Sequence, residues 1–255
     1  MVTYRIDLNC DLGESFGAYT LGEDEQVLNY ITSANIACGY HAGDPHVMFR
    51  TVGLAKAKGV AIGAHPGFPD LLGFGRREIP MKPEEIYHMV LYQLGALAAI
   101  ARAHNTKLNH VKPHGALYNM ACRDQDIADA IAQAVAHFDE NLTLFALSGS
   151  ILAKMGRQWG LKVAQEVFAD RTYQPDGTLT PRTQPDALIH DEHEAARRII
   201  QMIKEGKTEA TDGSTITVTA DTICVHGDSP KALSFVRQLH KRLTQEGILI
   251  KRVGS

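Results

Sequence analysis

The chain has 255 residues, of which 44% are hydrophobic and 22% charged, and its 26 basic and 29 acidic side chains give a formal net charge of −3. These values are typical of a globular protein, and without a basic stripe they exclude nucleic acid and anionic membranes as expected partners. No apolar run is long enough to span a bilayer, no secretory signal pattern is present, and the four cysteines are widely spaced. We therefore expect a cytoplasmic protein with free thiols.

Strand and helix patterns alternate along the whole chain. In order they predict a strand at residues 5–8, a helix at 23–31, a strand at 34–37, a helix at 45–58, a strand at 60–64, a helix at 83–104, a strand at 108–111, a helix at 124–138, a strand at 142–147, a helix at 151–159, a strand at 161–167, a loop-rich segment at 170–190, a helix at 192–204, strands at 215–219 and 222–225, a helix at 230–245 and a strand at 248–253. Repeated strand–helix units require a parallel sheet with right-handed crossovers. We predict one α/β domain over residues 1–255, a distorted (β/α) barrel of seven or eight mostly parallel strands.

Polar side chains follow the first predicted strand. Alternate residues of a strand share a face, so Asp7, Asn9 and Asp11 point the same way if the strand extends that far, with Glu14 shortly after. Crowded carboxylates raise one another's pKa values, which suits a general base or a metal ligand. The alternative is a hydrogen-bonded core cluster in which Asp11 or Glu14 caps the next turn. We favour function for Asp11 and leave both alternatives open for Asp7.

The next two strands also end in polar groups. Asn35 and His41 follow the second strand together with Cys38, which we interpret as a buried thiol because the chain offers no second pair of ligands for a structural zinc. His65 directly follows the third strand. Arg76 lies in the glycine-rich loop after it and is our candidate for an anion ligand.

Later strands repeat the pattern. Lys112 and His114 follow the fourth strand, where a lysine can pair with a carboxylate or phosphate oxygen and a histidine can move a proton near neutral pH. Glu166 and Arg171 follow the sixth, although an Asp170–Arg171 neighbourhood can simply support a loop. His226 ends a later strand as either a ligand contact or a core histidine. Because the carboxyl ends of parallel strands meet at one rim, these side chains are predicted to converge there.

Two motif matches fail. The segment 206–208 reads GKT, like the end of a phosphate-binding loop, but position 201 is Gln and the segment follows a helix. The turn at 148–150, SGS, lacks the nucleophile-elbow motif.

Six motifs in this order resemble the LamB/YcsF family: IDLNCDLGE, SANIACGYHAGDP, GAHPGFPDLLGFGRR, VKPHGALYN, EVFADRTYQPDGTL and ICVHGD. The resemblance extends from about residue 6 to residue 228. It implies a barrel like those of glycoside hydrolases and deacetylases. It also implies a role as the A subunit of a 5-oxoprolinase, beside subunits B and C, in the ATP-dependent hydrolysis of 5-oxo-L-proline (pyroglutamate) to L-glutamate.

Under this resemblance the reaction needs a base for water, cations for phosphate and oxyanion, a ligand for the substrate carboxylate and an acid for the ring nitrogen. We assign Asp11 as base, oriented by Glu14 or His41. Lys112 stabilises the oxyanion or phosphate, Arg76 binds the carboxylate, and His65 or His114 donates the proton. The expected further substrate contacts are Asn9, Asn35, Glu166, Arg171 and His226.

Two alternatives stay open. One is a metal-dependent amide or N-acetyl hydrolase, in which Asp11, His41 and His65 hold a divalent ion that activates water. The other is a non-catalytic subunit that presents 5-oxoproline to a catalytic partner. The position of the ATP site is not readable from the sequence.

Overall fold

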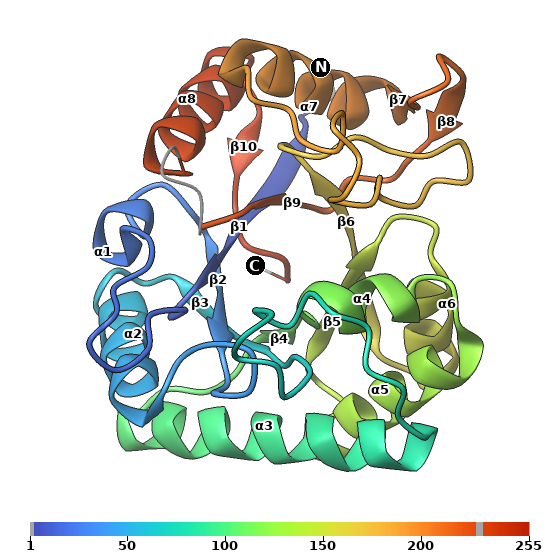
Figure 1. Ribbon diagram of the computed structural model, residues 1–255. Coiled ribbons are helices and arrows are strands. Elements are labelled where there is room, and N and C mark those ends of the chain that lie inside the picture. Colours follow the sequence, from blue (N-terminus) through green and yellow to red (C-terminus); the bar gives the residue numbers. More distant parts are fainter. Residues whose placement is uncertain (1–2, 228–231, 255) are drawn as a thin grey trace.

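A computed structural model describes residues 3–227 and 232–254 (Figure 1). Its centre is a closed ring of parallel strands in the order β1-β2-β3-β4-β5-β6-β9, with β9 pairing back to β1. The strands of the ring are β1 (Arg5–Leu12), β2 (Ser33–Ala37), β3 (Ala61–His65), β4 (His110–Val111), β5 (Thr143–Leu147), β6 (Lys162–Phe168) and β9 (Thr222–Val225). The ring confirms the predicted barrel of seven or eight mostly parallel strands.

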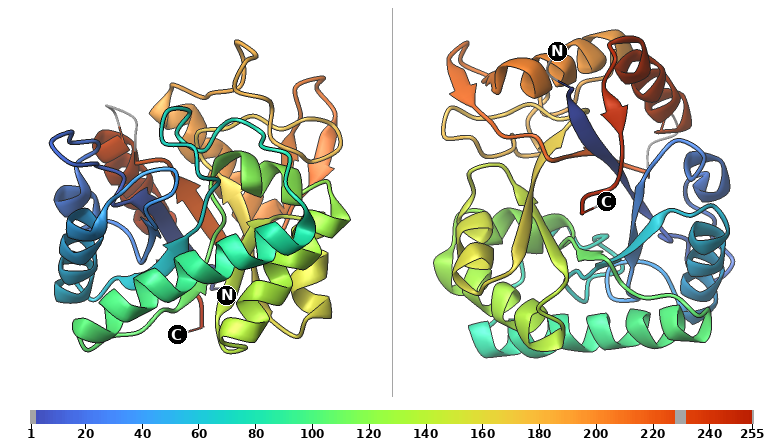
Figure 2. Two further views of the ribbon diagram at one scale, coloured as in Figure 1. Left: turned by 60° about the horizontal axis from the view of Figure 1, so that its bottom comes forward. Right: turned by 180° about the vertical axis from the view of Figure 1, so that it is seen from behind.

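Helices surround this ring (Figures 1 and 2). They are α1 (Asp24–Val27), α2 (Pro45–Ala57), α3 (Pro83–Ala103), α4 (Gly115–Ala121), α5 (Gln125–Phe138), α6 (Ile151–Gln158), α7 (Glu192–Glu205) and α8 (Ala232–Gln245). Several begin where the sequence supplies caps: the Asp44 side chain accepts hydrogen bonds from the first turn of α2, and Asp124 does the same for α5. Among the described residues, no helix is long and apolar enough to cross a membrane.

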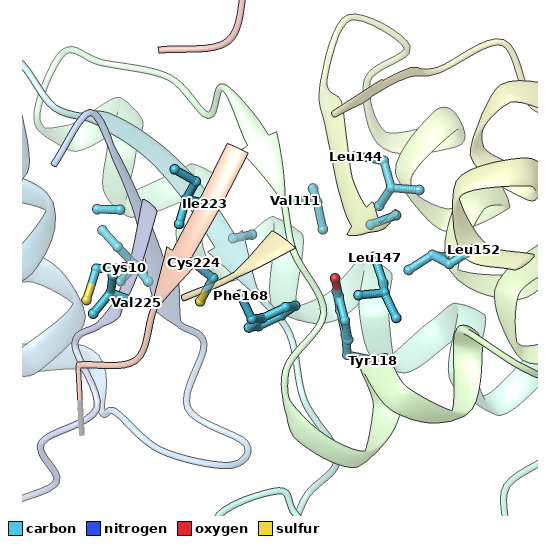
Figure 3. Packing of buried hydrophobic residues seen from close by; sticks show 14 of the residues in the cluster. Cys10, Val111, Tyr118, Leu144, Leu147, Leu152, Phe168, Ile223, Cys224 and Val225 are labelled. Carbon is cyan, nitrogen blue, oxygen red and sulfur yellow. The ribbon is translucent and has the colours of Figure 1, made fainter. Parts of the chain in front are cut away.

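Side chains of β1 alternate between two environments. Ile6, Leu8, Cys10 and Leu12 belong to the apolar core between strands and helices. Figure 3 shows another part of this core, where Leu144 of β5 packs near Leu152 of α6. Two of the intervening residues, Asn9 and Asp11, contact Glu166 of β6 and Lys112 just after β4. Neither strand is a neighbour of β1 in the ring, so these contacts cross the barrel interior. The interior of the barrel is therefore polar at this end, and its exterior is apolar.

Four elements differ from the sequence prediction. Helix α4 begins at Gly115, although no helix was predicted there. The predicted helix at 23–31 is reduced to α1, and the final strand 248–253 to β10 (Leu249–Ile250), which pairs with the start of β1. The segment 215–219 contributes β8 (Thr215–Thr217), which forms an antiparallel hairpin with β7 (Lys207–Glu209) instead of a barrel strand. Residues 230–231 of the predicted last helix, and Asp228 of the ICVHGD motif, lie outside the described residues.

Gly63 illustrates how a glycine makes room inside the barrel. It is the register partner of both Asn35 and His110, and the His110 ring passes over it so that Nε2 lies 2.8 Å from Asn35 Oδ1. A Cβ atom on Gly63 would lie 2.0 Å from His110 Nε2. The strand therefore requires glycine at this position because a neighbouring side chain occupies its space.

We expect Gly63→Ala to lower the free energy of unfolding by about 1–3 kcal/mol, the usual effect of overpacking a filled core. Urea denaturation of the purified chain measures it. Gly95→Ala is the matched control, because a Cβ at Gly95 meets nothing within 4 Å and the residue lies in α3. That variant is expected to gain about 0.5–1 kcal/mol from helix propensity. Equal behaviour of the two variants contradicts the steric explanation.

Candidate active site

The deepest polar layer of the barrel is structural. Asp7 is buried and accepts hydrogen bonds from the hydroxyl groups of Thr32, Ser33 and Thr222. Burial raises the pKa of the Asp7 carboxyl despite these donors. Asp7 does not line the cavity described below. Of the two alternatives for Asp7, this geometry favours the core cluster.

The next layer joins amides to carboxylates. The Asn35 amide donates to Asn9 Oδ1 at 2.7 Å and to Asp11 Oδ1 at 2.8 Å. The Asn9 amide donates to Glu166 Oε1 at 3.0 Å. All four side chains are buried. The two amides therefore hold the carboxylates of Asp11 and Glu166 in position.

Lys112 is the central cation of the site. Its Nζ lies 2.8 Å from Asp11 Oδ1, 3.2 Å from Glu166 Oε1 and 2.9 Å from Cys224 Sγ. Burial opposes the charge, but the neighbouring carboxylates outweigh it and raise the pKa of Lys112 well above its usual value. Burial likewise opposes ionisation of Asp11, but His65 and Lys112 hold the Asp11 pKa well below its usual range. Both groups are therefore charged at neutral pH.

Two histidines share a proton beside Asp11. His65 Nδ1 lies 2.7 Å from the carbonyl oxygen of Lys112, and His114 Nε2 lies 2.8 Å from that of Phe74, so both atoms donate. The two remaining nitrogens face each other at 2.9 Å. Two lone pairs at this distance repel, so one proton or another cation has to lie between them. Asp11 Oδ2, 3.3 Å from His65 Nε2, balances that charge.

A third histidine stacks against this pair. The His41 ring lies parallel to that of His114, with centroids 3.7 Å apart. Its Nε2 is 3.5 Å from Glu14 Oε1, and neither ring nitrogen has a hydrogen-bond partner in the described part of the chain. Burial lowers the pKa of both His41 and His114 well below the usual value, with neighbouring histidines adding to the effect. Both rings are therefore neutral at neutral pH.

The same histidines form a candidate metal site. Glu14, His41, His65 and His114 are buried and offer ligand atoms that all lie within 4.8 Å of one another. Three neutral imidazoles and a carboxylate suit Zn²⁺ and similar divalent ions. The carbonyl groups that fix His65 and His114 are the outer partners that metal-bound histidines usually have. Asp11, which the sequence suggested as a ligand together with His41 and His65, belongs instead to a second such group, with Cys224 and His226.

A cavity of about 470 Å³ opens above these groups. Seven of the residues predicted from sequence line it: Asp11, His65, Arg76, Lys112, His114, Arg171 and His226. The other five lie buried behind its wall: Asn9, Glu14, Asn35, His41 and Glu166. The predicted convergence of polar groups at one rim is therefore present, with an inner layer that supports an outer one.

Asp170 and His226 form a second acid–base pair at the cavity. His226 Nδ1 lies 2.8 Å from Asp170 Oδ2 and 3.0 Å from Oδ1. Burial opposes ionisation of Asp170, but His226 lowers the Asp170 pKa below its usual value. With Nδ1–H directed at this carboxylate, Nε2 of neutral His226 is the acceptor. The alternative of a salt bridge between Asp170 and Arg171 is not found among the described residues, and Arg171 instead donates to the carbonyl groups of Thr180 and Ala187.

Sequence reasoning missed three residues of the cluster. The Tyr118 hydroxyl donates to Glu166 Oε2 at 2.7 Å, Cys224 touches Lys112, and His110 bonds Asn35. The alternation of side chains along a strand could have identified two of them. His110 precedes Lys112 by two residues and Cys224 precedes His226 by two, so each shares a strand face with a predicted site residue. Tyr118 lies on α4, the helix that was not predicted.

Comparison with known proteins gives the family and the fold of this chain. The chain matches the family model described as LamB/YcsF family over residues 6–255. It is 61% identical to a protein of Halalkalibacterium halodurans that is named as the A subunit of 5-oxoprolinase, over 98% of each chain. Its fold matches the crystal structure of a lactam utilization protein from Thermus thermophilus with a TM-score of 0.91 and 49% identity, over 97% of this chain and 99% of that one.

A more distant likeness concerns the fold alone. A peptidoglycan deacetylase from Bacillus subtilis superposes with a TM-score of 0.50 at 13% identity, over 98% of this chain and 88% of that one. This confirms the expected deacetylase-like architecture. The family match covers nearly the whole chain and includes every motif on which the resemblance depended, so the chain belongs to the LamB/YcsF family.

Proposed function

We propose that this chain is the hydrolytic A subunit of an ATP-dependent 5-oxoprolinase, acting with subunits B and C. The observation that carries the proposal is the buried Asp11–Lys112–His65 cluster at the floor of one cavity, in a chain 61% identical to a 5-oxoprolinase A subunit. A carboxylate, an ammonium and a protonated imidazole pair are the groups that opening a cyclic amide needs.

The chemistry starts from a poor electrophile. A lactam carbonyl resists water, and transfer of a phosphoryl group from ATP to the ring oxygen makes the carbon attackable. Water then adds to that carbon, and the bond from carbon to ring nitrogen breaks as the nitrogen takes a proton. The product is an acyl phosphate of glutamate, and a second water converts it to glutamate and inorganic phosphate.

Each step has a group in the cavity. Asp11 accepts the proton of the attacking water and can return it to His65, 3.3 Å away, once the His65–His114 pair has given its proton to the ring nitrogen. Lys112 lies where it can stabilise the oxyanion. The proton shared by His65 and His114 is transferred to the ring nitrogen. Arg76 binds the substrate carboxylate, and His226 contacts the substrate.

Reconstitution tests the proposal. The chain is mixed with its candidate partner subunits, 5-oxoproline and ATP, and both glutamate and ADP are measured. Omission of each component in turn shows which ones are needed. Glutamate formation that needs this chain, both partners and ATP is the expected result. Unchanged glutamate formation when this chain is left out rejects the proposal.

A metal-dependent amide hydrolase is the second candidate, because Glu14, His41, His65 and His114 can hold an ion. When bound there, the ion would supply a Lewis acid beside the cavity. Metal analysis of the purified chain followed by chelation separates the two candidates. Under the first proposal, chelation of the isolated chain and return to the complex leaves turnover unchanged. Under the second, the chain releases about one equivalent of metal and activity is lost.

The Asp170–His226 pair supports a specific prediction. Asp170→Asn is expected to lower turnover of the complete complex by about 10²-fold, because an amide no longer holds His226 in the tautomer that leaves Nε2 as acceptor. Steady-state glutamate formation measures it, and the midpoint of the pH profile should move as well. Asp212→Asn, at an exposed turn of the β7–β8 hairpin, is the control. A profile that keeps its midpoint contradicts a role for the pair in proton transfer.

A further inference from the structure

Above the catalytic floor, the wall of the cavity is rich in arginine. Among the described residues that line it, five are cationic, namely Arg76, Lys112, Arg123, Arg171 and Arg182, and two are carboxylates, Asp11 and Glu78. Both carboxylates are already engaged, Asp11 by Lys112 and Glu78 by Arg123. Most of the charged side chains that the described wall presents to the cavity are therefore cationic, which favours an anionic ligand.

Arg171 shows how strongly this wall concentrates positive charge. Its side chain is 3% exposed. Two of its N–H groups donate to the carbonyl groups of Ala187 and Thr180, and no carboxylate of the described chain lies within ion-pair distance of its guanidinium. Burial, with Arg182 and Arg76 adding to it, lowers the pKa of Arg171 to about 10. A guanidinium held among others in this way is costly unless an anion joins it.

The arginines come from separate loops that meet over the cavity. Arg76 follows β3, with its guanidinium carbon 4.9 Å from the centre of the Phe74 ring, and Arg171 and Arg182 belong to the long loop after β6. The hydrogen bonds of Arg171 to Thr180 and Ala187 fold that loop back on itself. Arg182 is thereby held at the cavity together with Thr180 and Thr183. Guanidinium forks and hydroxyl groups are the usual ligands of phosphate oxygens.

We infer that Arg171 and Arg182, with the hydroxyl groups beside them, form a subsite for the phosphoryl group of a phosphorylated lactam. The inference rests on the proposed function and deepens it, because it names the form in which the substrate occupies this cavity. Such a ligand carries a carboxylate and a phosphate, and guanidinium groups bind both of these anions. A phosphoryl transfer from ATP to the amide oxygen is then the reaction that must supply this substrate.

Binding of inorganic phosphate to the full-length chain alone tests the subsite. Calorimetric titration at constant ionic strength, with chloride as the reference anion, should show one phosphate per chain. Arg182→Gln should weaken that affinity about 10- to 100-fold, the usual effect of losing a charge-assisted contact. Arg182 is exposed, whereas Arg171 supports its loop, so Arg182 is the safer position to change. Arg197→Gln is the matched control on α7, where Arg197 pairs with Glu194 on the surface, and it should leave phosphate affinity unchanged.

A second titration identifies which anion the arginines hold. Phosphate is added to the chain saturated with 5-oxoproline, and its binding should persist because carboxylate and phosphate occupy different parts of the cavity. Competition between the two overturns the inference, since the arginines then hold the substrate carboxylate. The inference is also overturned if the phosphate is an adventitious ion only. That result would be phosphate that binds no better than chloride, or phosphate affinity that Arg182→Gln and Arg197→Gln weaken equally. Neither titration needs the partner subunits or a turnover measurement. If phosphate binds as expected but the reconstituted complex forms no glutamate that depends on this chain, the proposed function is rejected and the phosphate subsite is not.

Discussion

Asp11→Asn is expected to lower the turnover of the complete three-subunit complex by about 10²–10⁴-fold, the usual contribution of a general base. Among the carboxylates of the described chain that line the cavity, only Asp11 touches both Lys112 and the His65–His114 pair. An amide of the same shape keeps the packing but can neither take a proton nor balance these charges. Steady-state measurement of glutamate and ADP gives the effect.

Separate measurement of 5-oxoproline affinity and of kcat distinguishes a catalytic role of this chain from a role in presenting the substrate to a partner subunit. If Asp11 is the base, Asp11→Asn leaves 5-oxoproline binding to the isolated chain within a few-fold of the parent and lowers kcat. If the chain only presents substrate to a partner, affinity falls and the turnover of bound substrate is preserved. Asp212→Asn again serves as control. Near-normal turnover of Asp11→Asn would remove Asp11 from the mechanism.

Lys112→Met is expected to cost about 3–5 kcal/mol of folding free energy, the range for removing one partner of a buried ionic cluster. Lys112 is 2% exposed and is the shared cation of Asp11 and Glu166. Methionine approximates its length but leaves two carboxylates close together without a counter-charge. Guanidinium denaturation at neutral pH measures the loss. The deficit should shrink as the pH falls, because Lys112 helps to hold the Asp11 pKa down, so that Asp11 of the variant becomes neutral at a higher pH than in the parent.

A double-mutant cycle separates this charge effect from packing. Asp11→Asn combined with Lys112→Met removes one charge of each sign, so its unfolding free energy should exceed the value expected from adding the two single losses. Strict additivity would show that Asp11 and Lys112 do not interact energetically. Near-UV circular dichroism confirms that each variant retains its tertiary packing.

Much of this site was predictable because barrel topology alone brings strand ends together. Asp11, His65, Lys112 and His114 lie at or just after the ends of three different strands, and periodicity located those strands to within a few residues. The fold class followed from the repeated units in the same way. These predictions depended on local patterns of polar and apolar residues, which can be read directly from the sequence.

The partners that sequence reasoning missed depend on longer-range geometry. Asp170 turned away from its neighbour Arg171 toward His226, 56 residues later, because Arg171 engages backbone carbonyl groups of its own loop. Helix α4 was not predicted, and it begins at Gly115, whose φ of 56° is one that only glycine adopts easily. Sequence alone could not show that Glu166 and Asn35 lie in the inner layer, behind Lys112 in the layer that lines the cavity. That order depends on the register between the strands of the closed ring.

The pairing of β1 with the last elements of the chain bears on biosynthesis. β1 is synthesised before two of its hydrogen-bonding partners, β9 and β10, which begin at Thr222 and Leu249. One edge of β1, with its backbone N–H and C=O groups, therefore stays open to solvent or to chaperones until those two segments have been synthesised. Truncations that remove β9 and β10 should consequently yield aggregation-prone chains, and the polar floor of the cavity should assemble only after β9 has paired with β1.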